Sequence, residues 1–444
     1  ECPALAIDMK LDTKEQSIIK LQNAINSAKN ISLKMEIPVH ILFATGDFEY
    51  KKANDLYSAQ SLIPNTYFKS LNGNGGIGYH NSDFSFIASA LLYSSNYGVP
   101  GGFVGAHPKG TDIKLERNTQ TVKSLVHTHS FIDNVIVSFN RTYYHHAEFE
   151  KSGAVGAEFL VKNYFGNINF NLDKFSFFNE MVVGVSGEFT DQKYGGYVFT
   201  PNSRLSNFSA YSYQSFEIGK HSIELSSRFV HSFVDPQDET KYSKNPPRDR
   251  VFNCFSFSIL VMHYINKKTS LGLNFSRSER PPTVEELYSN GPHLAAYSYE
   301  IGNRDLEPEL GYSAELSANY NTDGLNLSIS LYDNEFFNYI FPTNTGKLNY
   351  SQLLPIYQIS NTKARIIGGS IKFTYEFIEN FSTNFMASYL RGYNLTEHKN
   401  LPTMPPLKGK LELSYSKTNF FATLATDFTT YQRLIGDFES VTPG

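Results

Sequence analysis

The chain has 444 residues, a formal net charge of −4 and a mean hydropathy of −0.33. It contains no apolar run of about 18 residues, which excludes transmembrane helices, and no basic cluster of the kind that binds nucleic acid. Aromatic residues make up 15% of the chain and charged residues only 18%, a balance typical of a β-barrel whose strands alternate apolar and polar positions. The two cysteines are too few for a disulfide framework.

Alternation with a period of two residues recurs along the chain. Residues 167–172 (NINFNL), 325–332 (LNLSISLY) and 371–377 (IKFTYEF) each place apolar side chains on one face and polar ones on the other. A soluble sandwich buries its apolar face against a second sheet, whereas a membrane barrel turns that face to lipid. The connections decide between the two.

We predict about nineteen strands. Their ranges are 3–11, 16–28, 31–44, 65–80, 84–96, 111–126, 133–147, 156–171, 175–190, 204–217, 221–235, 250–264, 268–279, 309–321, 325–341, 357–376, 381–394, 406–416 and 419–432. Short turns at 80–83, 218–220, 266–268, 321–324 and 378–380 alternate with long loops at 45–64, 97–110, 191–203, 236–249, 280–308, 342–356 and 395–405. Short turns on one rim and long loops on the other favour an all-β, transmembrane antiparallel β-barrel of the outer-membrane receptor type.

The longest loop, 280–308, lies in a stretch that resembles the TonB-dependent outer-membrane receptors. The resemblance rests on SERPP at 278–282, EELY at 285–288, NGPH at 290–293, YEIGN at 299–303 and LEPE at 306–309. It extends to 95–101, 331–342 and 364–377. The form ELYSNGPH resembles the zinc-uptake branch of that family, although related iron-chelate receptors carry similar loops.

The resemblance implies a 22-stranded barrel that encloses a plug, and uptake driven by the TonB complex through a short TonB box. Residues 1–444 are then expected to be a partial barrel domain, without the plug and without the last strands, because an odd strand count does not close a bacterial barrel. A miscount near Glu1 is the other explanation of the odd number. The implied location is the outer membrane of a Gram-negative bacterium, as a multi-pass barrel and a monomer.

Histidines on the long-loop rim are candidate metal ligands, because imidazole and carboxylate suit zinc. His293 sits in the NGPH motif, and its alternative role is a hydrogen bond to the backbone. His146, Glu148 and Glu150 would project to one side of the strand tip YYHHAEFE, with His145 on the other side. A solvated strand end, where charge is expected, is the favoured explanation of that tip. His107 is a lone loop histidine.

Three further residues of the long loop, Glu286, Tyr288 and Tyr299, are candidates for contact with the ligand, because loop aromatics suit a siderophore or haem chelate. Tyrosines within the strands are explained by a membrane-interface girdle. We find no GxSxG, P-loop or HExxH motif, so we expect no enzyme activity.

The function predicted is TonB-dependent uptake of a metal ion or metal chelate, with zinc favoured over an iron siderophore or haem. No tightly bound cofactor is expected. The expected partners are outer-membrane lipid, the TonB complex and the extracellular metal or chelate. A passive porin and a surface adhesin are the alternatives from another class.

Overall fold

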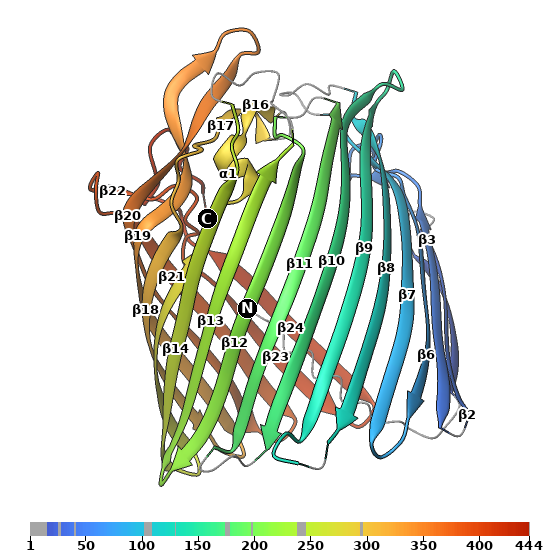
Figure 1. Ribbon diagram of the computed structural model, residues 1–444, viewed down its shortest axis with the longest axis vertical. Coiled ribbons are helices and arrows are strands. Elements are labelled where there is room, and N and C mark those ends of the chain that lie inside the picture. The colour runs from blue at the N-terminus through green and yellow to red at the C-terminus, as the bar shows by residue number, and fades with distance from the viewer. Residues whose placement is uncertain are drawn as a thin grey trace. The chain divides into compact units, whose positions relative to one another are not determined.

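The computed structural model describes residues 16–24, 28–39, 41–101, 109–128, 130–173, 178–196, 199–237, 246–293 and 296–443 (Figure 1). Within these residues the chain forms 24 β-strands and one short helix. Five strands, β4, β5, β16, β17 and β22, have four residues or fewer, which leaves nineteen longer ones. None of the described helices is long and apolar enough to cross a membrane.

The chain divides into two compact units, and each is described by itself. The first unit comprises residues 1–128, 134–167 and 192–196. Its strands are β1 (Gln16–Ala24), β2 (Ala28–Val39), β3 (Leu42–Ala53), β4 (Leu56–Tyr57), β5 (Leu62–Ile63), β6 (Phe68–His80), β7 (Phe84–Val99), β8 (Thr111–His127), β9 (Asn134–Glu150) and most of β10 (Val155–Asp173). From β1 to β9 each long strand pairs antiparallel with the next.

The second unit comprises residues 129–133, 168–191 and 197–444. It holds most of β11 (Glu180–Gly196), then β12 (Ser203–Ile218), β13 (His221–Pro236), β14 (Arg250–Asn266), β15 (Thr269–Arg280), α1 (Val284–Tyr288), β16 (Asn290–His293), β17 (Ser298–Ile301), β18 (Glu309–Asn321), β19 (Leu325–Asn349), β20 (Leu354–Ile378), β21 (Phe381–Asn394), β22 (Lys399–Asn400), β23 (Lys408–Lys417) and β24 (Phe420–Thr429). Its long strands from β12 to β24 form one antiparallel series.

The two faces of this series differ in chemistry, as the period-2 pattern predicts. Leu273, Leu316 and Leu331 lie opposite one another across β15, β18 and β19, and they are 57%, 52% and 56% exposed. On the other face, Ser330 donates a hydrogen bond to Glu315, and Asn274 lies opposite Glu315. Large apolar side chains that remain exposed in a continuous row belong against lipid, since water would penalise them.

Each of the five predicted short turns is present, and the connections between strands there span 81–83, 219–220, 267–268, 322–324 and 379–380. The predicted loop at 45–64 is wrong, because β3 occupies residues 42–53. Asp47, Glu49 and Lys51 resemble a polar loop, yet they alternate with Phe48 and Tyr50 in strand register.

The predicted loop at 342–356 is also wrong. β19 and β20 each run for 25 residues and leave only residues 350–353 as the tip of the hairpin. Pro342 keeps strand register opposite Ile359, and Gly346 lies within the register shift between Asn344 and Leu348. The predicted strand at 3–11 lies outside the described residues.

The apolar row gives a direct test of which face meets lipid. We expect Leu331→Arg to reduce the free energy of folding into bilayers by about 2–4 kcal/mol, because a guanidinium would enter hydrocarbon. The matched variant Ser328→Arg, on the opposite face of β19, should cost much less. Equal costs, measured by equilibrium unfolding in vesicles, would show that the two faces of β19 are assigned wrongly.

Candidate functional site

The loop between β15 and β18 is a folded structure rather than an open connection. Its helix α1 has five residues and begins with a capping box. Thr283 Oγ1 accepts a hydrogen bond from the Glu286 N–H at 3.2 Å, and Glu286 Oε2 accepts one from the Thr283 N–H at 2.8 Å. Pro281 and Pro282 precede the cap and prevent β15 from continuing.

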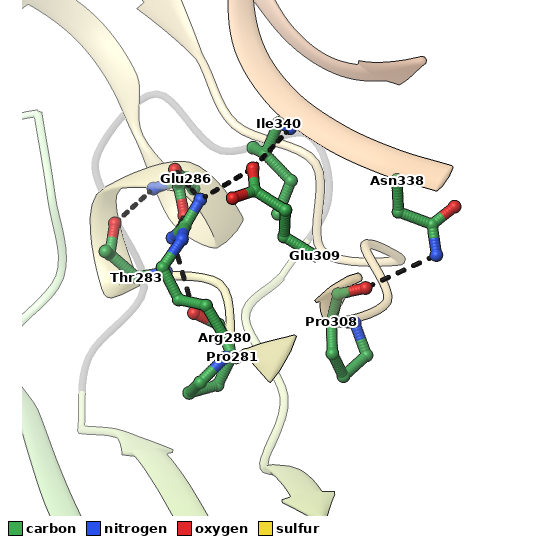
Figure 2. Close-up of polar contacts among 8 residues, drawn as sticks. All are labelled: Arg280, Pro281, Thr283, Glu286, Pro308, Glu309, Asn338 and Ile340. Atoms are coloured by element: carbon green, nitrogen blue, oxygen red, sulfur yellow. Dashed lines mark hydrogen bonds and ion pairs between the residues drawn. The ribbon is translucent and has the colours of Figure 1, made fainter. Parts of the chain in front are cut away.

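Arg280, the last residue of β15, joins this helix to two further strands (Figure 2). Its guanidinium donates to both carboxylate oxygens of Glu286, at 2.8 and 3.1 Å, and to Glu309 Oε2 at 3.3 Å. Glu309 in turn accepts a hydrogen bond from the Ile340 N–H of β19 at 2.9 Å. One planar cation therefore fixes the helix, the start of β18 and the upper part of β19 together.

Helix α1 packs into a hydrophobic cluster of the second unit. It is formed by Val234, Phe252, Cys254, Val284, Leu287, Tyr288, Leu306, Ile340 and Ile359. The Tyr288 hydroxyl donates to the carbonyl of Arg248, and burial raises the pKa of this phenol to about 12. Tyr288 therefore acts as an anchor of the loop, with its ring and its hydroxyl both occupied within the protein.

Gly302 allows the returning chain to pass close to the helix. Its N–H donates to the Ser289 carbonyl at 2.6 Å. The next N–H, of Asn303, donates to the backbone carbonyl of Glu286 at 2.9 Å. A Cβ at position 302 would lie 2.7 Å from backbone atoms of Leu287 and Tyr288. Only glycine fits this approach.

The short hairpin of β16 and β17 carries His293. His293 Nδ1 lies 2.8 Å from Glu300 Oε1, and its ring stacks on Phe199 with centroids 4.8 Å apart. Ser298 also donates to Glu300 Oε1, at 2.9 Å. Although burial opposes ionisation, the hydrogen bonds from His293 and Ser298 hold the pKa of Glu300 below its ordinary value of 4.5.

The predicted ligand-contacting residues of this loop make contacts within the protein. Glu286 is engaged by Arg280 and by the helix cap, and Tyr288 is buried. The Tyr299 hydroxyl donates to Asn290 Oδ1 at 3.3 Å. Of the set, His293 has the most exposed position, with 40% of its side chain accessible.

The second candidate site is the end of β9 in the first unit. There the register places His145 opposite Glu116 and His146 opposite Leu115, so the two imidazoles project to opposite faces, as predicted. His145 Nε2 lies 2.7 Å from Glu158 Oε1 of β10. His146 Nε2 is buried and lies 3.3 Å from Glu148 Oε1, within ion-pair distance but without hydrogen-bond geometry.

Aromatic side chains surround His146. The Tyr144 hydroxyl lies 3.1 Å from His146 Nδ1, and the Phe159 ring meets the imidazole edge-on at 5.6 Å. Tyr194 packs edge-on against Phe159 in the same way, at 5.7 Å. The pair formed by His146 and Glu148 therefore sits in an aromatic-walled corner on the side away from the apolar residues of β9.

The remaining predicted ligands are Glu150 and His107. The Glu150 carboxylate lies close to Gly156, where a Cβ would be 3.1 Å from its Oε1. His107 lies outside the described residues. Among the residues that the structure describes, no group of three or more His, Cys, Asp or Glu side chains is arranged to hold a metal ion.

Sequence reasoning missed several residues that organise these sites. The capping box was visible as T-x-x-E at 283–286, and it would have predicted the helix and the role of Glu286. Arg280 and Glu300 appeared only as members of the SERPP and YEIGN motifs, and Glu158 and Phe199 had no signal. Each becomes significant only through a partner that is distant in the sequence or set by hairpin register.

We expect Gly302→Ala to destabilise the docked loop by about 1–3 kcal/mol, because the added methyl group meets backbone atoms that cannot move aside. Amide hydrogen exchange of α1 and Asn303 should accelerate, while the long strands keep their protection. Gly187→Ala is the matched control, since a Cβ there has nothing within 4 Å. Unchanged exchange in Gly302→Ala would contradict the close approach.

The lowered pKa of Glu300 predicts an acid-sensitive hairpin. A carboxylate with a depressed folded-state pKa stabilises the hairpin at any pH above its unfolded value, and this contribution is lost as pH falls through the folded-state pKa. We expect protection of the β17 amides to persist down to about pH 4.5 and to fall below it. In Glu300→Gln this step should be absent, and an identical step would assign the acid sensitivity to another group.

Comparison with known proteins places this fold and these loops in one family. The family model "TonB dependent receptor-like, beta-barrel" matches residues 47–442, and the chain belongs to this family. The fold class predicted from the sequence is thereby confirmed. The predicted resemblance to TonB-dependent receptors is confirmed as well.

Solved structures with a similar fold include the copper transporter OprC, with a TM-score of 0.82 and 16% identity over 95% of this chain and 70% of that one. The FrpB iron transporter from Neisseria meningitidis has a TM-score of 0.72 and 11% identity over 92% and 67% of the two chains. The alcaligin receptor FauA from Bordetella pertussis has a TM-score of 0.66 and 11% identity over 94% and 68%. At these identities the likeness is one of fold.

Proposed function

We propose that this chain is the barrel domain of an outer-membrane receptor that takes up a metal ion or metal chelate with energy from the TonB complex. The observation that carries the proposal is the corner at the end of β9. There an imidazole and a carboxylate, His146 and Glu148, lie 3.3 Å apart among aromatic rings on the polar side of the strand. Membership of a receptor family favours this function over a porin or an adhesin.

The spacing of the two groups suits a shared ion. Ligand atoms bound to one zinc ion at about 2.0–2.2 Å lie roughly 3.3–3.6 Å apart in a tetrahedral arrangement. Two protein ligands leave the other coordination positions to water or to a chelating molecule. Such a site binds weakly enough to release its cargo, which a transport receptor needs.

The chemistry of the pair favours borderline ions. Imidazole with carboxylate suits zinc and copper, and we favour zinc. Two proteins of similar fold are named as a copper transporter and an iron transporter. The rings of Tyr144, Phe159 and Tyr194 provide apolar walls of the kind that hold a chelate. An iron chelate is therefore the second candidate cargo.

The other parts of the proposal follow from the strands and the family. The apolar row of the second unit would meet outer-membrane lipid in a Gram-negative bacterium, and the receptor would act as a monomer. The cargo is a substrate rather than a resident cofactor. His293 on its hairpin would make a separate contact with the cargo from the long-loop rim.

The test is a titration of the full-length receptor with zinc chloride, copper sulfate and a ferric siderophore. We expect His146→Ala and Glu148→Gln each to weaken binding of the preferred metal about tenfold or more, because each removes one of two ligands. His293→Ala, measured in the same series, should weaken capture several-fold if its hairpin contributes.

His145→Ala is the matched control for this titration. It is the neighbouring histidine, but it faces the other side of β9 and pairs with Glu158, so binding should not change. Equal loss in His145→Ala and His146→Ala would overturn the site. Binding of the ferric siderophore alone, insensitive to His146, would shift the function to chelate recognition by the aromatic walls.

A further inference from the structure

Two histidines of the second unit face each other at the strand ends that are joined by short turns. His221 is the first residue of β13, and His263 lies near the end of β14. The two are direct cross-strand partners, and their ring centroids lie 4.7 Å apart with an angle of 35° between the planes. They are adjacent to the short turns at 219–220 and 267–268, away from the long loops.

The pair lies on the apolar face of the sheet. His221 is opposite Ile218 of β12, and His263 is opposite Leu271 of β15. These two neighbours are 59% and 39% exposed, like the other apolar residues of that face. The pair therefore occupies the edge of the apolar face, where a barrel strand leaves lipid for water.

One nitrogen of this pair is unsatisfied within the part of the chain that the structure describes. His263 Nδ1 is buried and has no hydrogen-bond partner there. A buried polar atom without a partner costs about 1–3 kcal/mol. Stacking against the His221 ring does not supply a donor or an acceptor in its place.

Other strand histidines have a hydrogen-bond partner for the corresponding ring nitrogen. His231 lies on β13 and on the same face as His221, and its Nδ1 is 2.8 Å from Asn253 Oδ1 across the ladder. His80 Nδ1 is 2.6 Å from Ser85 Oγ. In both cases the residue opposite in register is a hydrogen-bonding partner, whereas His263 faces a second imidazole.

We propose that His221 and His263 form a second metal site, distinct from the cargo site, which binds a borderline divalent ion such as Zn²⁺. Two imidazoles from paired strands supply two nitrogen ligands, and water at the membrane edge completes the coordination. The ion would satisfy the orphaned nitrogen of the pair. It would also fasten β13 to β14, so that binding stabilises the folded barrel.

The experiment titrates the full-length receptor in detergent micelles with zinc chloride and follows both stoichiometry and the urea concentration at half-unfolding. We expect the wild type to bind one zinc ion more than either His221→Ala or His263→Ala. Zinc should raise the unfolding midpoint of the wild type, and the part of the rise that comes from this site should vanish in both variants.

His231→Ala is the matched control, since it removes a histidine of the same strand and face that has no imidazole opposite. Its stoichiometry should equal that of the wild type. Should an alanine variant fail to fold, His221→Tyr keeps an aromatic side chain suited to the membrane edge and removes the ligand.

Unchanged stoichiometry in both His221→Ala and His263→Ala, or an equal loss in His231→Ala, would overturn the proposal. The experiment distinguishes this site from the cargo site. His146→Ala should leave the second site intact, and the two substitutions at β13 and β14 should leave capture at His146 and Glu148 intact.

Discussion

The long loop of the second unit depends on one guanidinium. Arg280 is the last residue of β15, and its guanidinium binds a carboxylate from the helix and a carboxylate from β18. The side chains of Glu286 and Glu309 are only 20% and 16% exposed, so their charges need a partner nearby. A lysine would supply the charge but not the planar fork that meets both carboxylates (Figure 2).

The consequences of this contact extend through the loop. With α1 fixed, Leu287 and Tyr288 enter the cluster formed by Phe252 and its neighbours, and Gly302 returns the chain along the helix. The hairpin of β16 and β17 follows this helix, and β17 pairs in parallel with β20. His293 is presented on a preorganised element, so a ligand would not have to order the loop on binding.

The sequence predicted those features that depend on local alternation. Period 2 identified the long strands and correctly separated His145 from His146, because adjacent residues of a strand face opposite sides. It failed where charge or proline disguised the alternation, at Asp47 and Glu49 in β3 and at Pro342 in β19. Bulges and hairpin extensions have no strong local signature, since the partner strand absorbs the irregularity.

The partners of each histidine on neighbouring strands could not be predicted from the sequence, and these partners determine what each imidazole can bind. His145 faces Glu158 and His293 lies diagonally from Glu300, so both imidazoles are held by carboxylates. His146 lies beside Glu148 on its own strand, with Nε2 and Oε1 3.3 Å apart but without hydrogen-bond geometry. These three contacts involve the same residue types, and the positions of the two partners on the strands distinguish them.

The same rule explains the pair at the other end of the strands. A shift of one residue in the pairing of β13 with β14 would place His221 opposite Met262 or Tyr264 and remove the meeting of two imidazoles. The register is fixed by the apolar face, on which Phe229 meets Phe255. The requirement that apolar side chains share one face therefore also sets which histidines meet. The proposed site at His221 and His263 therefore depends on strand register rather than on any local motif.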